Sequence, residues 1–325
     1  MTGGAEQNLA NLVTVLEEAG HEAELVRLPV VWSQSHLLQS AFAWRLLTIE
    51  ADLVIAMNFP SYFVRHPRKV VWLNHQHRAA YDALDQPWSD IGLDDRSLTV
   101  HRDLVDWDTR VLAESAHLFT VSERVGERLR RYNGLDSEVL YHPPPLADRL
   151  HPGAMGDYLF CATRLEGNKR PDLMVAAMQH VDAGLRLVIA GRGSMHNELE
   201  NQIRRLRLQQ RVSLVGFVGD AELTELYAGA RAVLYAPSDE DYGYVTLQAF
   251  CAGKPVVTTS DAGGVLEWVR DDVTGAVAEP TADSLAAAVN RLAGDTARCR
   301  ALGEAGRERV TQLSWTKVVS ALLRR

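Results

Sequence analysis

An acidic loop in the C-terminal half contains the residues best suited to chemistry. The apolar run 231–237 leads into the segment SDED (238–241), which is followed by a glycine and a short helical pattern that ends at Gly253. This order predicts a strand, a loop and a helix N-terminus. Backbone N–H groups in the first helical turn lack partners within the helix, so with the helix dipole they favour an anion. Because Glu240 can accept hydrogen bonds from hydroxyls beside that anion, the loop indicates a nucleotide sugar as ligand.

Residues 237–257 resemble the donor-binding motif of the retaining glycosyltransferases of family four, and the EDYG sequence resembles a bacterial subgroup of that family. The resemblance implies that Glu240 is a catalytic residue that holds hydroxyls of the transferred sugar. It also implies contacts with the sugar and with the diphosphate from the residues that follow, which are Tyr242, Gly243, Tyr244, Val245 and Thr246.

The motif departs from the family pattern at its second acidic position. In the family a second Glu binds the ribose, whereas here seven residues separate Glu240 from Gln248. An amide keeps an acceptor for a ribose hydroxyl but loses the charge. Hydrogen bonds to charged groups contribute roughly 1.5–3 kcal/mol, against about 0.5–1.5 kcal/mol for neutral ones. We therefore expect weakened or altered donor affinity.

Two further segments of this half carry candidate ligand-binding residues. Arg164 and Lys169 lie between an apolar strand pattern and a helix, and two such cations suit a diphosphate. The resemblance implies the same role for both. It also places Phe217 and Val218 where the family holds the nucleobase, although Phe217 can equally be read as a core residue.

The N-terminal half contributes His75 and Gly4. Two apolar runs, 51–60 and 69–78, predict buried strands, and the second delivers His75 and His77 to its C-terminal end, where doubly wound sheets bind ligands. The resemblance implies that a histidine here faces the donor sugar, and we favour His75; an ordinary surface histidine is the alternative. It also implies that the GG pair ending at Gly4 lies close to the donor's sugar and phosphate.

Other patterns in this half predict structural elements. Residues 21–28 alternate like a strand, and 34–48 read as a helix that packs on the core. Ser122 is a predicted N-cap for a helix with a basic outer side. That side is either solvated or meets anionic lipid, and it is formed by Arg124, Arg128, Arg130 and Arg131.

Strands and helices alternate through both halves, which predicts an α/β protein with two parallel sheets. The resemblance implies the GT-B architecture, in which two Rossmann-like domains face each other across a cleft. We predict an N-terminal, acceptor-side domain over 1–148, a donor-binding domain over 149–313 and a helix over 314–325 that returns to the first domain. The first strand of the implied fold is missing before Gly4, so we expect that the natural start lies upstream or that the chain is truncated.

Net charge, apolar runs and cysteine content limit the classes of partner and the compartment that we expect. The 325 residues carry a net charge of −8, which argues mildly against nucleic acid. No run approaches the roughly 20 apolar residues of a membrane span. The three cysteines are odd in number and widely spaced, which indicates reduced thiols and a cytoplasmic protein. Peripheral contact at the inner membrane face is an alternative. Neither a metal site nor a cofactor is expected, because His75 and His77 have no completing ligand nearby.

These features predict an enzyme that transfers a sugar from a nucleoside-diphosphate sugar to a hydroxyl acceptor in cell-surface glycan, glycolipid or glycoside synthesis. The acceptor is a glycan, a lipid-linked sugar or a small molecule. One alternative is a non-catalytic nucleotide-sugar-binding subunit, suggested by Gln248 and the missing strand. Others are a GT-B sugar phosphorylase or epimerase, and a single-domain glycosyltransferase in which SDED binds a metal.

Overall fold

The computed structural model describes residues 4–34, 36–82, 84, 91 and 93–324. The chain forms two compact units: unit 1 contains Met1–His142 and Ser314–Arg325, and unit 2 contains Pro143–Leu313. The sequence placed the division after residue 148, whereas the structure places it after His142. Gly3 of the predicted GG pair lies outside the described residues.

Unit 1 is built on a four-stranded parallel sheet. Its strands are β1 (Val54–Asn58), β2 (Lys69–His75), β3 (His117–Thr120) and β4 (Glu138–Val139), in the order β1-β2-β3-β4. The two predicted strands of residues 51–60 and 69–78 are confirmed. Six of the seven residues of β2 are buried, as a continuous apolar run in a parallel sheet requires.

Helices cover this sheet, and their ends follow local capping rules. The α-helices are α1 (Gly4–Glu18), α2 (Leu37–Arg45), α3 (Asp95–Ala113), α4 (Glu123–Asn133) and α11 (Trp315–Leu322), with short 3-10 helices η1 (Ser61–Phe63) and η2 (Arg78–Ala80). The predicted N-cap is confirmed, because the Ser122 hydroxyl accepts a hydrogen bond from the Val125 amide at 3.1 Å. Gly134 ends α4 with φ of 65°.

Two predictions for unit 1 are wrong. Residues 21–28 form no strand, because an alternating pattern becomes a strand only when another strand supplies the hydrogen-bond ladder. Arg128 does not belong to a basic outer side of α4. It is 3% exposed, and its Nε donates to Asp82 Oδ2 at 2.7 Å.

Unit 1 also buries a lysine and an aspartate. Lys69 is 1% exposed and donates to the carbonyl oxygens of Tyr62 at 3.0 Å and Val111 at 2.6 Å. Burial lowers its pKa to about 8, although nearby Glu114 opposes the shift. Asp108 accepts a 2.6 Å hydrogen bond from Tyr81 Oη, and burial raises the Asp108 pKa to about 7.

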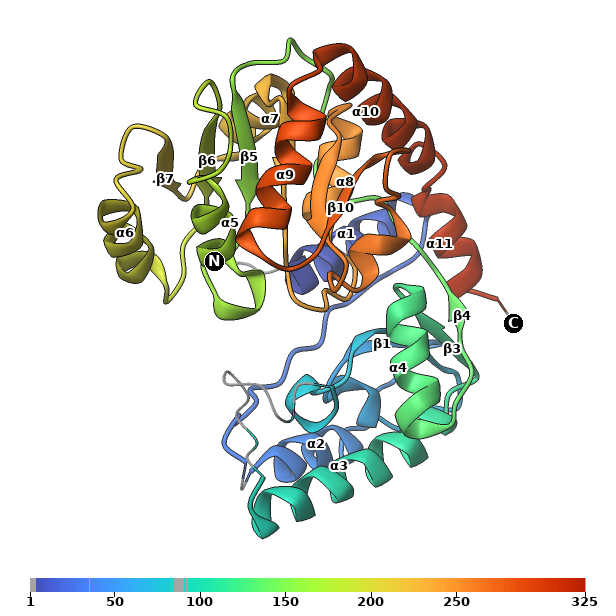
Figure 1. Cartoon of the computed structure of the whole chain (residues 1–325). Coiled ribbons are helices and arrows are strands. Elements are labelled where there is room, and N and C mark those ends of the chain that lie inside the picture. Colours follow the sequence, from blue (N-terminus) through green and yellow to red (C-terminus); the bar gives the residue numbers. More distant parts are fainter. Residues whose placement is uncertain (1–3, 35, 83, 85–90, 92, 325) are drawn as a thin grey trace. The chain divides into compact units, whose positions relative to one another are not determined.

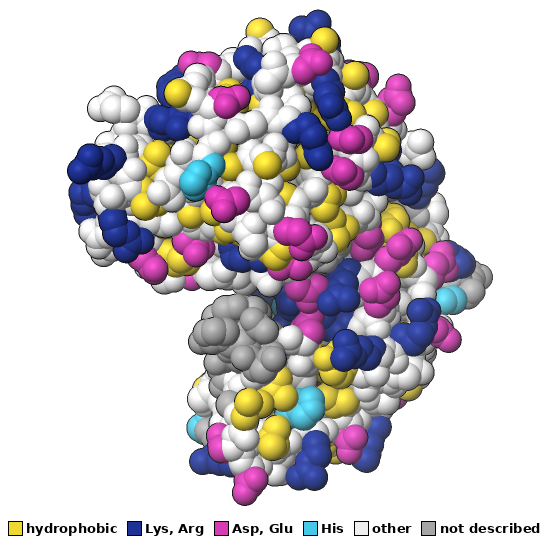
Figure 2. All heavy atoms as spheres, in the orientation of Figure 1, with side chains coloured by type: hydrophobic (Ala, Val, Ile, Leu, Met, Phe, Trp, Pro, Cys, Tyr) yellow, Lys and Arg dark blue, Asp and Glu magenta, His cyan; other side chains and the backbone are white. Residues whose placement is uncertain are grey.

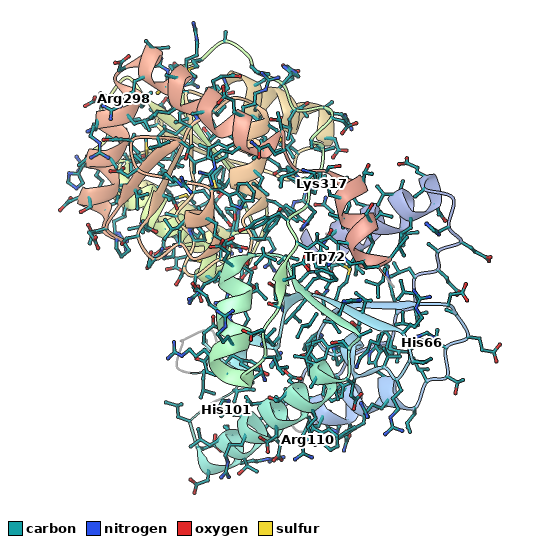
Figure 3. The ribbon with its side chains drawn as sticks, turned by 90° about the vertical axis from the view of Figure 1, so that its right-hand side faces the viewer. His66, Trp72, His101, Arg110, Arg298 and Lys317 are labelled. Atoms are coloured by element: carbon teal, nitrogen blue, oxygen red, sulfur yellow. The ribbon has the colours of Figure 1, made fainter. Side chains whose placement is uncertain are left out.

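The C-terminal segment completes unit 1. Trp72 of β2, labelled in Figure 3, packs edge-on to Trp315 of α11 at 6.3 Å and to His142 at 5.0 Å. Its Nε1 donates to the Leu140 carbonyl oxygen at 3.1 Å. Burial lowers the His142 pKa to about 3, so this ring is neutral and packs as an aromatic group.

Unit 2 is built on a six-stranded parallel sheet with the order β10-β9-β8-β5-β6-β7. The first strand in sequence, β5, is central, and the chain turns outward on one side through β7 before returning to β8 on the other. This is the doubly wound order, with its switch point between β5 and β8. The strands are β5 (Tyr158–Ala162), β6 (Arg186–Ala190), β7 (Val212–Gly216), β8 (Ala232–Leu234), β9 (Val256–Thr259) and β10 (Gly275–Ala278).

Helices of unit 2 alternate with its strands and surround the sheet (Figure 1). They are α5 (Pro171–Ala177), α6 (His196–Arg205), α7 (Asp220–Gly229), α8 (Tyr244–Cys251), α9 (Ala282–Ala293) and α10 (Thr296–Val310), with 3-10 helices η3 (Gly167–Lys169) and η4 (Gly264–Glu267). The predicted architecture of two parallel-sheet α/β domains is confirmed for the two units.

The distribution of surface charge and the character of the helices relate to the predicted nucleic-acid and membrane partners. Acidic and basic side chains are interspersed over the visible face of unit 2, and basic side chains gather over α6 (Figure 2). Among the described residues, no helix combines the length and apolar character needed to cross a bilayer.

Candidate functional site

The candidate site of unit 2 lies at the carboxyl edge of its sheet, on the two sides of the switch point. The loop after β5 carries Lys169 and the loop after β8 carries Glu240. Ligands of doubly wound sheets bind outside this edge, where loops from neighbouring strands diverge. The strand order therefore brings together two loops that are about 70 residues apart in sequence.

Lys169 and Glu240 are in direct contact. Lys169 Nζ donates to Glu240 Oε2, and Tyr235 Oη donates to the same oxygen at 2.8 Å. The Lys169 and Glu240 side chains are 11% and 18% exposed. Burial, reinforced by the adjacent Glu240, raises the Tyr235 pKa well above its usual value, so the phenol keeps the proton that it donates. Tyr235 was not predicted as a site residue, because it continues an apolar run and resembles one more residue of a buried strand.

Backbone contacts hold Glu240 against the loop after β9. The Glu240 amide donates to the Ala262 carbonyl oxygen at 3.1 Å, and the Gly264 amide donates to the Glu240 carbonyl oxygen at 2.7 Å. Glycine is needed for this approach: a Cβ on Gly264 would lie 2.4 Å from the Asp241 carbonyl oxygen, and Gly263 has φ of 64°. The glycine pair thus sets the position of the carboxylate.

Arg170 joins the loops after β5, β8 and β9. Its guanidinium donates five hydrogen bonds. They go to both carboxylate oxygens of Asp261, to Thr259 Oγ1, and to the carbonyl oxygens of Ala236 and Pro237. Burial alone would raise the Asp261 pKa, but hydrogen bonds from Arg170 and Thr259 hold it below its usual range. Sequence reasoning passed over Arg170; its position directly after Lys169 was the available signal.

The N-terminus of α8 faces the same loop. Gly243, with φ of 80°, precedes the helix and supplies no side-chain cap. A Cβ on Gly243 would lie 3.7 Å from both Glu240 Cγ and Thr246 Oγ1, so these two side chains flank one position. Thr246 is 0% exposed, and within the described chain its Oγ1 makes no hydrogen bond. A buried hydroxyl without a partner at a helix N-terminus fits an anion or a sugar hydroxyl.

The Gln248 side chain is buried and engaged at both ends of its amide. It is 8% exposed, its Oε1 accepts from Tyr227 Oη at 3.1 Å and its Nε2 donates to the Pro145 carbonyl oxygen at 3.2 Å. Both ends of the amide are thus used inside unit 2. A carboxylate could not donate to Pro145, which is a physical reason for Gln at this position.

The remaining predicted residues of unit 2 are dispersed around this edge. Arg164 is exposed and Val218 is half-buried. Phe217 is 61% exposed, so its alternative interpretation as a core residue is wrong. Tyr242 is 6% exposed and packs edge-on to Tyr244 at 5.5 Å and to Trp268 at 6.3 Å. Val245 is also buried, as the second residue of α8.

Unit 1 contains the other two predicted residues, His75 at the end of a strand and Gly4 at the start of a helix. His75 ends β2, is half-buried, and its Nδ1 lies 2.8 Å from the Gln76 carbonyl oxygen. Gly4 is the first residue of α1. Their roles toward a donor stay predictions. In the part of the chain that the structure describes, no three His, Cys, Asp or Glu side chains converge as a metal site would need.

Comparison with known proteins identifies the fold and the C-terminal domain. Residues 151–309 match the family described as Glycosyl transferases group 1. This match covers just under half of the chain, so the similarity to that family is shown for residues 151–309. The matched range includes the candidate site residues of unit 2, from Arg164 to Gln248, and so it covers the loops at the switch point.

Individual curated proteins are also similar to parts of this chain. Glycogen synthase of Mycobacterium tuberculosis is 34% identical over 163 residues, which are 49% of this chain and 39% of the relative. The match spans between 18% and 58% of the length of these curated relatives. The fold extends further than this sequence similarity.

Two solved structures match nearly the whole chain. Sucrose-phosphate synthase of Thermosynechococcus elongatus has a TM-score of 0.79 at 18% identity, covering 99% of this chain and 92% of its own. HepE of Anabaena, crystallised with UDP-glucose, has a TM-score of 0.70 at 19% identity, covering 99% and 95%. At these identities the matches establish the fold, which is that of GT-B glycosyltransferases.

Proposed function

We propose that this chain is a retaining glycosyltransferase that moves a sugar from a nucleoside-diphosphate sugar to a hydroxyl group. The contact between Lys169 and Glu240 beside the N-terminus of α8 is the observation that carries the proposal. A cation and helix amides suit the diphosphate, and a carboxylate suits the sugar hydroxyls. The similarity of the fold to HepE, whose structure contains UDP-glucose, supports a nucleotide-sugar donor.

The proposed roles follow from charge development in the reaction. As the bond between the anomeric carbon and the diphosphate breaks, negative charge grows on the leaving group. Lys169, Arg164 and the amides at the start of α8 would stabilise that charge. Glu240, held by Tyr235, would accept hydrogen bonds from hydroxyls of the transferred sugar, with His75 orienting the same ring. We expect these cations to make a metal ion unnecessary.

Without an enzyme nucleophile, retention requires that the acceptor oxygen attack from the side that the diphosphate leaves. The acceptor hydroxyl proton would pass to the departing phosphate oxygen, so atoms and charge balance without an enzyme nucleophile. No described side chain is assigned that covalent role. The acceptor is proposed to belong to cell-surface glycan, glycolipid or glycoside synthesis.

The proposed location is the cytoplasm, where nucleotide sugars can serve as donors. All three cysteines, Cys161, Cys251 and Cys299, are free thiols. Free thiols suit a reducing compartment. Peripheral contact with the inner membrane face belongs to the same proposal, and vesicle co-sedimentation tests it.

The proposal is tested first by binding and then by turnover. A panel of nucleotide sugars is screened by thermal shift, and each stabilising donor is incubated with water alone and with hydroxyl acceptors. NMR then gives the anomeric configuration of the products. We expect one donor class to stabilise unit 2 and to give product with retained configuration, also in the presence of EDTA. Absence of both stabilisation and donor cleavage would refute the proposal.

Gln248 favours one second candidate, a non-catalytic nucleotide-sugar-binding subunit. Its amide is engaged by Tyr227 and Pro145, so it offers the ribose less than a free carboxylate would. In this case a donor would bind without turnover. Assays with added phosphate separate a further alternative, because a GT-B phosphorylase cleaves glycosidic bonds only when phosphate is present.

A further inference from the structure

Arg170 is held in a backbone conformation that few side chains adopt. It has φ of 47° and ψ of 48°, in the left-handed region, and it directly precedes Pro171, before which an extended conformation is normal. Asp239, the residue before Glu240, has the same φ of 47°. Strain of this kind persists only where the surrounding structure fixes the residue, and it is concentrated at functional sites.

The Arg170 side chain makes the contacts that fix it. Its guanidinium donates from Nη1 to Asp261 Oδ2 at 2.8 Å and from Nη2 to Asp261 Oδ1 at 2.7 Å, which is a two-point ion pair. It also donates to the carbonyl oxygens of Ala236 and Pro237 at 2.9 Å and 2.6 Å, and to Thr259 Oγ1 at 2.8 Å. One side chain from the loop after β5 therefore binds both the loop after β8 and the loop after β9.

Backbone hydrogen bonds extend this connection to the charged residues of the site. The Asp239 amide donates to the Asp261 carbonyl oxygen at 2.9 Å, and the Glu240 amide donates to the Ala262 carbonyl oxygen at 3.1 Å. On the other side, Lys169 directly precedes the arginine in sequence and contacts Glu240. The arginine thus holds the chain on both sides of the contact between the lysine and the glutamate.

A direct contact with the donor diphosphate is the competing role for Arg170. Its Nη atoms, however, are both paired with Asp261. Burial alone would raise the Asp261 pKa, but hydrogen bonds from Arg170 and Thr259 hold it below its usual range. The carboxylate therefore stays charged and balances the guanidinium, so a phosphate would have to displace it.

We propose that Arg170 is a positioning residue for glycosyl transfer, which fixes the loop of Lys169 against the loop of Glu240 and contacts neither the donor nor the reacting atoms. This role rests on the proposed function and deepens it. Lys169 would stabilise the leaving diphosphate and Glu240 would hold the transferred sugar, so their relative position matters most when the bond between these two parts of the donor breaks. Loss of Arg170 should slow that step more than it weakens donor binding.

Hydrogen exchange tests the positioning of the loops without a substrate. Amide exchange is followed by NMR in the wild type, Arg170→Gly, Arg170→Lys and Arg186→Ala. Glycine removes the guanidinium and adopts the left-handed conformation without strain. Arg186 forms an exposed pair with Asp157 at 2.6 Å and is the matched control. We expect the Asp239 and Glu240 amides to exchange about tenfold faster in Arg170→Gly and in Arg170→Lys, which lacks the planar fork, and to be unchanged in Arg186→Ala.

Donor cleavage in water then separates positioning from ligand binding. We expect Arg170→Gly to lower kcat about 100-fold and to change the donor Kd by less than about threefold, with Arg186→Ala equal to the wild type. The assays are run well below the melting temperature of each variant, so that unfolding does not lower the rate. Asp261→Asn keeps one acceptor oxygen for Arg170 and should give a smaller loss in the same direction. It replaces Arg170→Gly if that variant does not fold.

Three results would overturn the positioning role. The first is wild-type exchange of the Asp239 and Glu240 amides in Arg170→Gly. The second is a weaker donor Kd with unchanged kcat, which would assign Arg170 to the diphosphate itself. The third is faster exchange with unchanged kcat and Kd, which would make Arg170 a structural residue only. If the wild type neither binds nor cleaves a nucleotide sugar, the proposed function fails, while the exchange rates still decide whether Arg170 fixes the two loops.

Discussion

The two units use their charged side chains in opposite ways. Unit 1 buries Lys69, Asp108 and Arg128 and pairs each of them with protein groups, so these side chains serve the fold. Unit 2 places Lys169 and Glu240 at strand ends, partly open to solvent, beside a helix N-terminus. Residue type alone therefore does not distinguish a structural charge from one that is available to a ligand. Burial of the side chain and its position relative to the strand ends do so together.

Lys69 and Lys169 make this comparison in its simplest form. Lys69 begins β2 and donates to two backbone carbonyl oxygens, which a ligand cannot displace without unfolding the surrounding turns. Lys169 follows β5 and donates to the carboxylate of Glu240, a side chain that is partly open to solvent. Substitutions of buried charges, site residues and helix caps test this difference between the units.

Replacing Lys69 should destabilise unit 1 most. We expect Lys69→Met to lower the free energy of unfolding by about 3–5 kcal/mol, because it leaves the carbonyl oxygens of Tyr62 and Val111 and the carboxylate of Glu114 without their buried cation. Urea unfolding measures the change, with exposed Lys317→Met on α11 as the control. Equal unfolding free energies of the two variants would contradict the structural role of Lys69.

Replacing Lys169 should leave the fold and remove donor binding. We expect Lys169→Met to weaken nucleotide-sugar binding by about 1.5–3 kcal/mol, the contribution of a charged hydrogen bond, with little change in unfolding. Gln248→Ala should lose less, because the Gln248 amide is already engaged within unit 2. Calorimetric titration measures both, and the reverse order would contradict the diphosphate site.

The buried carboxyl of Asp108 predicts a pH dependence of stability. Its folded-state pKa of about 7 lies above the ordinary value of about 4, so between these values the folded chain keeps a proton that the unfolded chain has lost. The stability that Asp108 contributes is therefore complete below about pH 4 and is lost as the pH rises to about 7.

Asp108→Asn removes this titration while it keeps an acceptor for Tyr81. We expect the wild type to lose about 3 kcal/mol of unfolding free energy relative to the variant between pH 4 and pH 7, because each unit of pKa shift corresponds to about 1.4 kcal/mol. Urea unfolding of both proteins across that range gives the difference, in which the other ionisable groups cancel. Parallel pH profiles would show that Asp108 is ionised in the folded chain.

Helix caps should give the smallest effects, and they report on each unit separately. Ser122 caps α4 in unit 1, and the Thr281 hydroxyl accepts from the Ser284 amide at 3.3 Å to cap α9 in unit 2. We expect Ser122→Ala and Thr281→Ala each to cost about 1 kcal/mol. Differential scanning calorimetry shows which transition moves. If both variants shift a single transition equally, the units unfold together.

Local patterns predicted much of the fold. Continuous apolar runs identified β1, β2, β5 and β8, and Ser122 identified the start of α4, because these signals depend on neighbours in sequence. The strand predicted at residues 21–28 was wrong because a ladder needs a partner from elsewhere in the chain. Arg128 was misplaced for a similar reason: Asp82, 46 residues earlier, draws it inward.

The candidate site was predictable only in part. Glu240 and Lys169 were found by their loops and by family resemblance, and the structure brings them into contact. Tyr235 and Arg170 were missed because their roles depend on side chains and carbonyl oxygens from other strand ends. The engagement of Gln248 by Tyr227 and Pro145 likewise arises from tertiary packing and leaves no local pattern.

The return of residues 314–325 to unit 1 also affects how the protein is made. A ribosome delivers the chain from the N-terminus, and domains generally fold as they emerge. Unit 2 is continuous and can fold as soon as Leu313 is released. Trp72 and His142 must wait for Trp315, so the unit that is translated first is the last to be finished.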